Sequence, residues 1–403
     1  MSDAIEAKKK TFEYPGGDEI DSITGIEIED NTDDDERIID PFDPAKIRVE
    51  TRTMTIDLLL TRIDHRELDL TPGFQRKGGI WSEGAQSKLI ESTLIRIPLP
   101  AFYIDATNED QWLVVDGLQR LTTLKRFVLD KTLRLRGLEF LTQLRGKNYD
   151  ELSRPYQRRI NETQVVVYLI DKGTPSEVKF NVFKRINTGG LPLSAQEIRH
   201  ALNQGPATDL LAQLANSKEF KRAIDNGIRD DRMADRECVL RFLSFTIFPY
   251  QAYKAKEFDG FLNDRMADIN KMTEKERENL KQQFFRTMTA ASTIFGTDAF
   301  RKRYRPDASR YPINKALFEC WSVGLNQLDD RRLQNLEERK NTLLTKFMDT
   351  MLNDHAFENA ISQGTGDISK VRKRFSTIEQ LIEEVLMAKR SAPATYLQEA
   401  GSI

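Results

Sequence analysis

The sequence predicts an α+β protein in which a mixed N-terminal domain precedes an α-helical C-terminal domain. The runs with the composition and alternation of β-strands all lie before residue 171. After Pro206, almost every apolar stretch has the period of a helix. At 403 residues the chain is long enough for two or three domains, each with its own core. We predict one domain at 46–205 and a helical domain at 206–403.

Residues 1–45 are expected to form an acidic tail that is disordered or loosely docked. They hold 15 acidic and 4 basic residues, with Gly and Pro and no sustained apolar period. The remaining 48 acidic and 57 basic residues make the body of the protein basic. A basic body suits a polyanion such as DNA or a nucleotide, although an ordinary solvated helical surface has a similar composition.

Cysteine content and apolar runs predict a soluble, cytoplasmic protein. The chain has only two cysteines and no N-terminal apolar stretch, so neither a disulfide framework nor a secretory signal is expected. Its longest apolar runs are far too short to span a membrane, so no membrane partner is expected either.

The predicted elements of the first domain follow in order. Residues 52–61 are expected to form a short strand that leads into a helix. Apolar residues at helical spacing over 82–94 predict a second helix, with Ser82 as its N-cap. Two β-rich runs at 101–104 and 112–115 flank a turn and predict a hairpin. The second of these runs leads directly into Asp116-Gly117, after which the period becomes helical.

Three further elements complete this domain. Residues 163–170 are apolar and β-branched and predict a central or largely buried strand. Capping boxes at 174–177 and 194–197 each predict the start of a helix. The glycines at 188–190 end the first of these helices, and Gly205-Pro206 ends the second.

The strand–turn–helix at Asp116-Gly117-Leu118-Gln119-Arg120 is the main candidate site. A glycine turn at a helix N-terminus presents backbone N–H groups and the positive end of the helix dipole to an anion. Gln119 can donate from its amide, and Arg120 carries a guanidinium fork suited to phosphate. Asp116 would hold a divalent cation, a ribose or a base donor. The alternative is structural: Asp116 caps the helix and Arg120 makes a surface ion pair.

Several ordered blocks resemble the N-terminal domain of GmrSD-type restriction systems. The run from Trp112 to Leu124 is similar to the DGQQR signature of that family. Other blocks in the same order are Phe74-Gln75-Arg76 with Ile80-Trp81-Ser82, Val182 to Gly190 with Leu193-Ser194, and Arg236-Glu237. Several ordered blocks are far more specific than one short motif.

The resemblance implies a ParB/sulfiredoxin-like core that binds and can hydrolyse a nucleoside triphosphate. The divalent cation that Asp116 could hold would then be Mg²⁺. The resemblance also implies action on modified or phage DNA. The catalytic residues would be Asp116, Gln119 and Arg120. One departure weakens the case for hydrolysis, because Leu118 stands where the signature has its first glutamine.

Further nucleotide-binding residues are expected from the other blocks. Gln75 and Arg76 lie in a glycine-containing loop, and Arg185 and Asn187 end a helix. Each has a structural alternative: local loop hydrogen bonds for the first pair and capping for the second. Trp81 would either stack on a base or anchor the helix that follows it.

The leading hypothesis is a nucleotide-binding component of a bacterial restriction or anti-phage defence system. The chain has no P-loop motif, so we predict an NTPase of another type. Its three histidines are widely separated and its cysteines unpaired, so no zinc or HNH nuclease centre is expected and a partner nuclease would cut the DNA. The helical domain would contact DNA or that partner, while oligomeric state stays open. Two alternatives are a non-catalytic ParB-like DNA-binding or scaffold protein and a stand-alone metal-dependent DNase.

Overall fold

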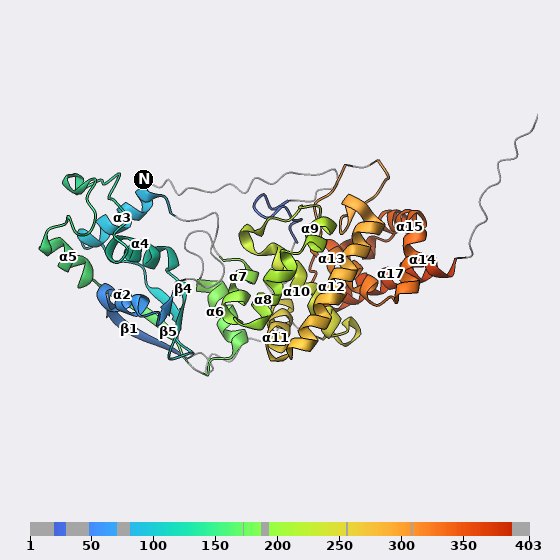
Figure 1. Cartoon of the computed structure of the whole chain (residues 1–403), viewed down its shortest axis with the longest axis horizontal. Helices are drawn as coiled ribbons and strands as arrows, with labels where there is room; N and C mark the ends of the chain where they lie inside the picture. Colours follow the sequence, from blue (N-terminus) through green and yellow to red (C-terminus); the bar gives the residue numbers. More distant parts are fainter. Residues whose placement is uncertain are drawn as a thin grey trace, which may run out of the picture.

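The computed structural model confirms an α+β chain with a helical C-terminal region. It describes residues 20–29, 48–70, 81–171, 173–186, 193–254, 257–307 and 309–388. All five strands of the described sheet lie before residue 171, as the strand pattern predicted. The N-terminal domain and the helical half lie at opposite ends of the molecule (Figure 1).

A mixed five-stranded sheet forms the centre of the N-terminal domain, in the order β1-β5-β3-β4-β2. The hairpin strands β3 and β4 are antiparallel, whereas β5 runs parallel to β3 and antiparallel to β1. Strand β5 therefore has a partner on each side, in agreement with the prediction of a central strand. The strands are β1 (Val49–Thr55), β2 (Leu68–Asp69), β3 (Phe102–Asp105), β4 (Trp112–Asp116) and β5 (Gln164–Ile170).

Four helices pack on one face of this sheet and enclose the core of the domain. Phe102, Ile104 and Val114 from the sheet are buried with Leu121 and Leu124 of α4. Ser82 caps α3 as predicted, because its hydroxyl accepts the N–H of Ala85. The four helices are α2 (Ile56–Asp64), α3 (Glu83–Leu94), α4 (Leu118–Val128) and α5 (Arg154–Asn161).

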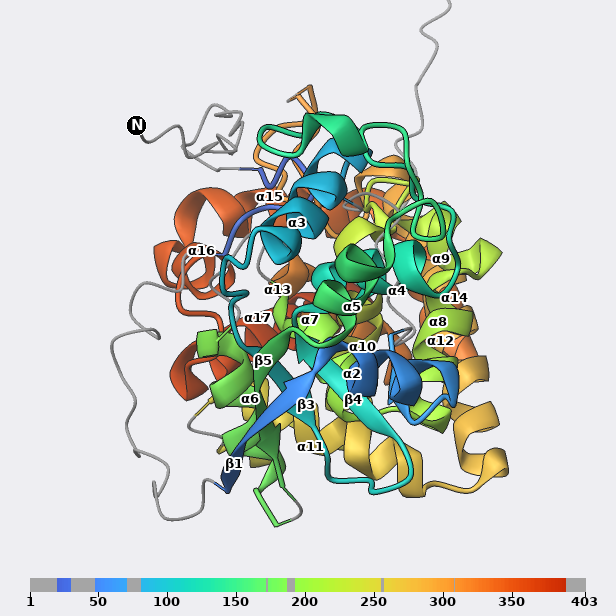
Figure 2. The same ribbon diagram turned by 90° about the vertical axis from the view of Figure 1, so that its left-hand side faces the viewer.

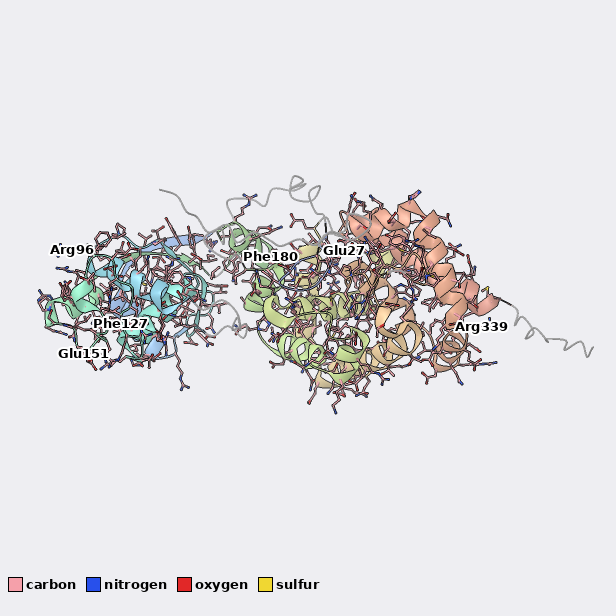
Figure 3. All side chains as sticks on the ribbon, turned by 90° about the horizontal axis from the view of Figure 1, so that it is seen from above. Glu27, Arg96, Phe127, Glu151, Phe180 and Arg339 are labelled. Atoms are coloured by element: carbon pink, nitrogen blue, oxygen red, sulfur yellow. The ribbon has the colours of Figure 1, made fainter. Side chains whose placement is uncertain are left out.

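Helices α6 (Ser176–Ile186) and α7 (Ala195–Leu202) join the sheet to the helical half. Phe180, Phe183 and Ile198 form a small core with Val115 and Ile170 on the second face of the sheet. Phe180 lies between the two halves when the molecule is viewed from above (Figure 3). The capping box predicted at the start of α7 is present.

Ten helices form the described helical half around one large aromatic-rich core. Phe242, Phe284 and Phe318 are fully buried there. Figure 2 shows this half behind the sheet when the molecule is viewed from the N-terminal-domain end. The helices are α8 (Pro206–Ala215), α9 (Lys218–Ala223), α10 (Ala234–Ile247), α11 (Phe258–Lys271), α12 (Glu274–Phe295), α13 (Lys315–Asn326), α14 (Asp330–Glu338), α15 (Lys340–Asn353), α16 (His355–Ser362) and α17 (Ile368–Met387).

Residues 20–29 differ from the disordered or loosely docked tail that the composition predicted, because they dock tightly into this helical core. Ile26 is buried in the core and forms a parallel bridge with Ile313. Glu27 pairs with Lys302 at 2.7 Å. Glu27 and the nearby Glu29 are therefore partners of buried bases, a pairing that composition alone does not reveal. The other residues of the predicted tail up to residue 47 lie outside the described residues.

Glu29 enters a buried cluster of charges around Arg241. The two side chains are 6% and 3% exposed and meet at 2.6 Å. Glu237 pairs with both Arg241 and Lys315, so helices α10 and α13 share one network of charges with residues 20–29. Burial alone would raise the pKa of Glu29, but the charges of Arg241 and Lys315 outweigh it and hold the pKa below its ordinary value.

Replacing Glu29 tests whether residues 20–29 are part of the helical domain. Glu29→Ala leaves a buried cation short of one partner, and breaking a buried pair in this way costs about 3 kcal/mol. We expect the free energy of unfolding of the helical half, measured by urea denaturation, to fall by that amount. Glu383→Ala removes a half-exposed partner of Arg332 in the same half and should cost less than about 1 kcal/mol. Equal effects of the two variants would show that the segment is only peripheral.

His200 of α7 predicts a pH dependence of folding stability. Burial, followed by the charge of Arg236, lowers its pKa to about 4. Arg236 can only donate, so Nδ1 of His200 accepts and the ring is neutral. The unfolded chain, with a histidine pKa of about 6.5, then binds a proton that the folded chain does not. The free energy of unfolding is therefore highest above pH 6.5, and it falls by about 2 kcal/mol between pH 7 and pH 5.

We expect His200→Gln to remove that part of the pH dependence, measured as urea unfolding at pH 7 and pH 5. His355→Gln is the matched control, because the His355 side chain is largely exposed. If His200→Gln keeps the full slope of the wild type, His200 is not the group responsible.

Candidate functional site

The glycine turn between β4 and α4 has the geometry of an anion-binding helix start. Asp116 ends the strand, and Gly117 is the N-cap residue with φ 98°, in the left-handed region. Gly117 has no side chain with which to cap the first N–H groups of the helix. The first N–H groups of an α-helix have no partner within the helix, and an anion can accept from them.

Gly117 is required at this position for two reasons. Its positive φ is strained for any residue with a Cβ. A Cβ on Gly117 would also lie 2.3 Å from Cδ1 of Phe102, whose ring is fully buried in the sheet. The turn and the start of β3 are therefore packed as closely as the backbone allows.

Arg120 points into the protein and fastens this turn. Its guanidinium donates to Asp116 Oδ2 at 2.7 Å, to the carbonyl of Ala101 at 3.2 Å and to that of Pro100. It also lies over the ring of Phe102, 4.6 Å from the centroid. Burial lowers the pKa of Arg120, and Asp116 partly offsets that effect. The fork that we expected to meet phosphate thus binds three groups of the protein in this structure.

The structural alternative for the motif is only partly correct. Gly117, not Asp116, occupies the N-cap position. The ion pair between Asp116 and Arg120 is present, but it is not on the surface, since the side chains are 25% and 10% exposed. This pair fixes the position of the Asp116 carboxylate at the mouth of the turn.

Gln119 links the turn to the start of α3. Its Oε1 accepts the backbone N–H of Trp81 at 3.3 Å, and Nε2 of Gln86 donates to the carbonyl of Trp81 at 2.7 Å. The indole of Trp81 packs against the core of the domain. Trp81 therefore anchors the helix, in agreement with the second of its two predicted roles. The two hydrogen bonds also place Trp81 beside the turn.

The remaining predicted site residues are not brought together in the described structure. Gln75, Arg76 and Asn187 lie outside the described residues. Arg185 is exposed near the end of α6. That helix packs against Val115, the neighbour of Asp116, so α6 and the turn share the same end of β4.

Two tyrosines near the turn were not predicted. Tyr103 pairs with Asp116 in the β3–β4 register, and its ring stacks on Tyr168 at 4.8 Å. Burial, followed by the charges of Tyr168 and Asp116, raises the pKa of Tyr103. The alternation of β3 could have placed Tyr103 on the face opposite Phe102, but only the strand order brings Tyr168 beside it.

A buried lysine–aspartate pair fixes α6 against the hairpin and was also not predicted. Lys179 donates to Asp105 Oδ2 at 3.1 Å and to the hydroxyl of Thr107. Both charged side chains are about one-tenth exposed. The pair closes the second face of the sheet near the ends of β3 and β5, so its role is to hold α6 in place.

The donors at the turn suit an anion better than a bare metal ion. Among the described residues, no group of three or more His, Cys, Asp or Glu side chains is placed to hold a metal. Asp116 supplies one carboxylate, and Mg²⁺ commonly takes one or two carboxylates together with substrate phosphates and water. The cavity of about 480 Å³ lined by Phe285, Arg286 and Leu333 lies between α12 and α14, away from the turn.

Fold and site together define an α+β domain with an uncapped strand–turn–helix at its centre. Residues 57–203 match the model of a family described as "GmrSD restriction endonuclease, N-terminal domain". This stretch of the chain is therefore similar to the GmrSD N-terminal domain, as the ordered sequence blocks predicted. A search of curated proteins finds no match. Among the described residues, no helix has the length and apolar character needed to cross a membrane.

Gly117→Ala tests the packing of the turn. The strained φ and the overlap with Phe102 should together destabilise the N-terminal domain by about 2–4 kcal/mol. Gly137→Ala is the matched control, because Gly137 also has a positive φ (62°) but no atom within 4 Å of an added Cβ. We expect it to cost only about 1 kcal/mol in urea unfolding. A cost for Gly117→Ala no larger than the control would show that the close contact with Phe102 is unimportant.

Proposed function

We propose that this chain is the nucleotide-binding, DNA-directed component of a restriction or anti-phage defence system, acting with a separate nuclease. The observation that carries the proposal is the uncapped, glycine-started N-terminus of α4 inside a GmrSD-family domain. A nucleoside triphosphate supplies the anionic phosphates that such a helix start binds.

In this proposal each residue of the turn has a distinct role. Gly117 lets the phosphates approach the backbone, and the N–H groups that follow it donate to them. Asp116 contacts Mg²⁺ on the phosphates or a hydroxyl of the nucleotide. Gln119 donates from the amide nitrogen left over when its oxygen accepts from Trp81. Arg120 acts mainly by holding Asp116, because its guanidinium is already engaged by the protein.

The surrounding loops would complete the nucleotide site. Gln75 and Arg76 precede Trp81 by only a few residues, and Trp81 is hydrogen-bonded to Gln119. Arg185 lies near the end of α6, which packs beside Asp116, and Asn187 follows that helix in the sequence. A ParB/sulfiredoxin-like arrangement of this domain, with these four residues around the phosphates, is part of the proposal.

A second candidate function is a non-catalytic DNA-binding or scaffold protein that only holds a ligand at the turn. The observation that favours it is the engaged state of Arg120, together with Leu118 in place of the first glutamine of the family signature. Both features remove polar groups that could act on a γ-phosphate. Binding without turnover would distinguish this function from an NTPase.

Gln119→Glu tests the turn as the nucleotide site. The new carboxylate keeps an oxygen for Trp81 and favours the helix dipole, so the fold should be as stable as wild type. It also places a negative charge where phosphate would bind, and we expect at least a tenfold loss of affinity for Mg²⁺-bound ATP, GTP, CTP or UTP by calorimetry. Gln164→Glu makes the same change at an exposed position, the first residue of β5, and this variant should bind the nucleotide as wild type does. Unchanged affinity in Gln119→Glu would exclude the turn.

Leu118→Gln tests hydrolysis. Restoring the signature glutamine at the first position of α4 should increase phosphate release from the preferred nucleotide relative to wild type, with and without DNA. Arg120→Ala should abolish binding, since Asp116 then loses its partner. No phosphate release from wild type or Leu118→Gln, with binding intact, would favour the ligand-holding scaffold.

A further inference from the structure

A closed surface loop at residues 134–147 has no role in the nucleotide site. Leu135 closes it in both directions, donating to the carbonyl of Lys147 at 3.0 Å and accepting from Gly146 at 2.7 Å. The loop includes the short 3-10 helix η2 (Thr142–Leu144) and packs its own Leu138 into the core. It lies beside α3, at the end of the molecule away from the helical half (Figure 1). Compact loops of this kind are frequently functional.

A buried carboxylate of α3 fixes the tip of this loop. Glu91, only 3% exposed, accepts the backbone N–H groups of Glu139, Phe140 and Leu141 at 3.0, 2.8 and 2.7 Å. Burial alone would raise the pKa of Glu91, but these three bonds outweigh it, so the pKa is lowered. The hydroxyl of Ser87, also on α3, accepts the N–H of Arg136. The loop is therefore held in one conformation before any partner arrives.

The fixed loop exposes an aromatic ring and several basic side chains to solvent. Phe140 is 67% exposed although Glu91 binds its backbone. The segment 134–147 holds four basic residues and one acidic residue. The acid, Glu139, pairs with Lys88 of α3. Arg136 and Arg145 are exposed, and Arg136 also lies 3.5 Å from a carboxylate oxygen of Glu83 on α3. The loop therefore carries a net positive charge, and its large exposed apolar side chain is Phe140.

We propose that this loop is a DNA-docking surface, with Arg136, Arg145 and Lys147 on the phosphates and Phe140 against the bases of the duplex. Cations fix a protein on the DNA backbone, and exposed apolar wedges such as Phe insert between base steps or stack on them. The fixed conformation lowers the entropy cost of such contacts. The inference rests on the DNA-directed part of the proposed function, and it assigns the contact to the N-terminal domain instead of the helical half.

The chemistry of the loop favours DNA over a protein partner. Protein interfaces are built on a contiguous apolar core, and Phe140 is one ring between charged residues. The net positive charge of the loop complements a polyanion. An acidic protein surface would satisfy the arginines but would leave the exposed ring without a partner.

The test is binding of the full-length protein to a fluorescent DNA duplex, measured by anisotropy at several salt concentrations. We expect Phe140→Ala to weaken binding at least fivefold with the same dependence on salt. The double variant Arg136→Ala/Arg145→Ala should weaken it at least tenfold and reduce the slope of log affinity against log salt by about 1–2. All these side chains are exposed, so urea unfolding should match the wild type.

Two exposed residues of the helical half serve as matched controls. Met387→Ala removes an exposed apolar side chain and Arg331→Ala an exposed arginine, and both should bind DNA as wild type does. If wild type binds DNA and the loop variants bind equally well, the docking surface is wrong while the DNA-directed function stands. If wild type binds no DNA at low salt, the DNA-directed function itself fails and this inference fails with it. Loss of binding to a partner protein, with DNA affinity unchanged, would assign the loop to protein docking.

Discussion

The buried guanidinium of Arg120 is the interaction on which the N-terminal domain depends. It joins the first turn of α4 to the end of β4 and to the segment that enters β3, through one carboxylate and two carbonyls. The ring of Phe102 beneath it fills the space that a side chain at residue 117 would need. An arginine buried this deeply must have its donors satisfied. The turn is therefore rigid, and the first N–H groups of α4 are held in a fixed direction.

Local sequence signals were enough to predict the elements that frame this turn. The apolar period identified α3 and α4, the β-rich runs identified the hairpin, and the caps at Ser82 and Ser194 are present in the structure. The inward direction of Arg120 could not be predicted in this way. It depends on the carbonyls of Pro100 and Ala101, which only the folded hairpin brings to the guanidinium. For the same reason Tyr168 was not predicted, because its neighbour Tyr103 belongs to a strand far away in the sequence.

The acidic segment at the start of the chain shows the limit of composition as a guide. Disorder is predicted when charge is high and apolar residues are few, because too little surface can be buried. Residues 20–29 are nevertheless ordered, because one isoleucine is buried in the core of the helical half and two glutamates pair with buried cations. Figure 3 shows Glu27 within the helical half. The bases that make the rest of the chain positive are thus partly neutralised inside it, and net charge overstates the cationic surface.

The packing between the two halves provides a physical connection from the turn to the helical core. Val115, next to Asp116, contacts the core formed by Phe180, Phe183 and Ile198 of α6 and α7. Arg199, one residue after Ile198, reaches Asp259 of α11 at 2.6 Å and Glu237 at 3.9 Å, and Glu237 belongs to the charge cluster that holds Glu29. Close-packed interiors transmit small displacements, but coupling requires an element with two arrangements. Helices α6 and α7 are the place to look for that element, because they contact the second face of the sheet while α7 packs against α10 and α6 against α11.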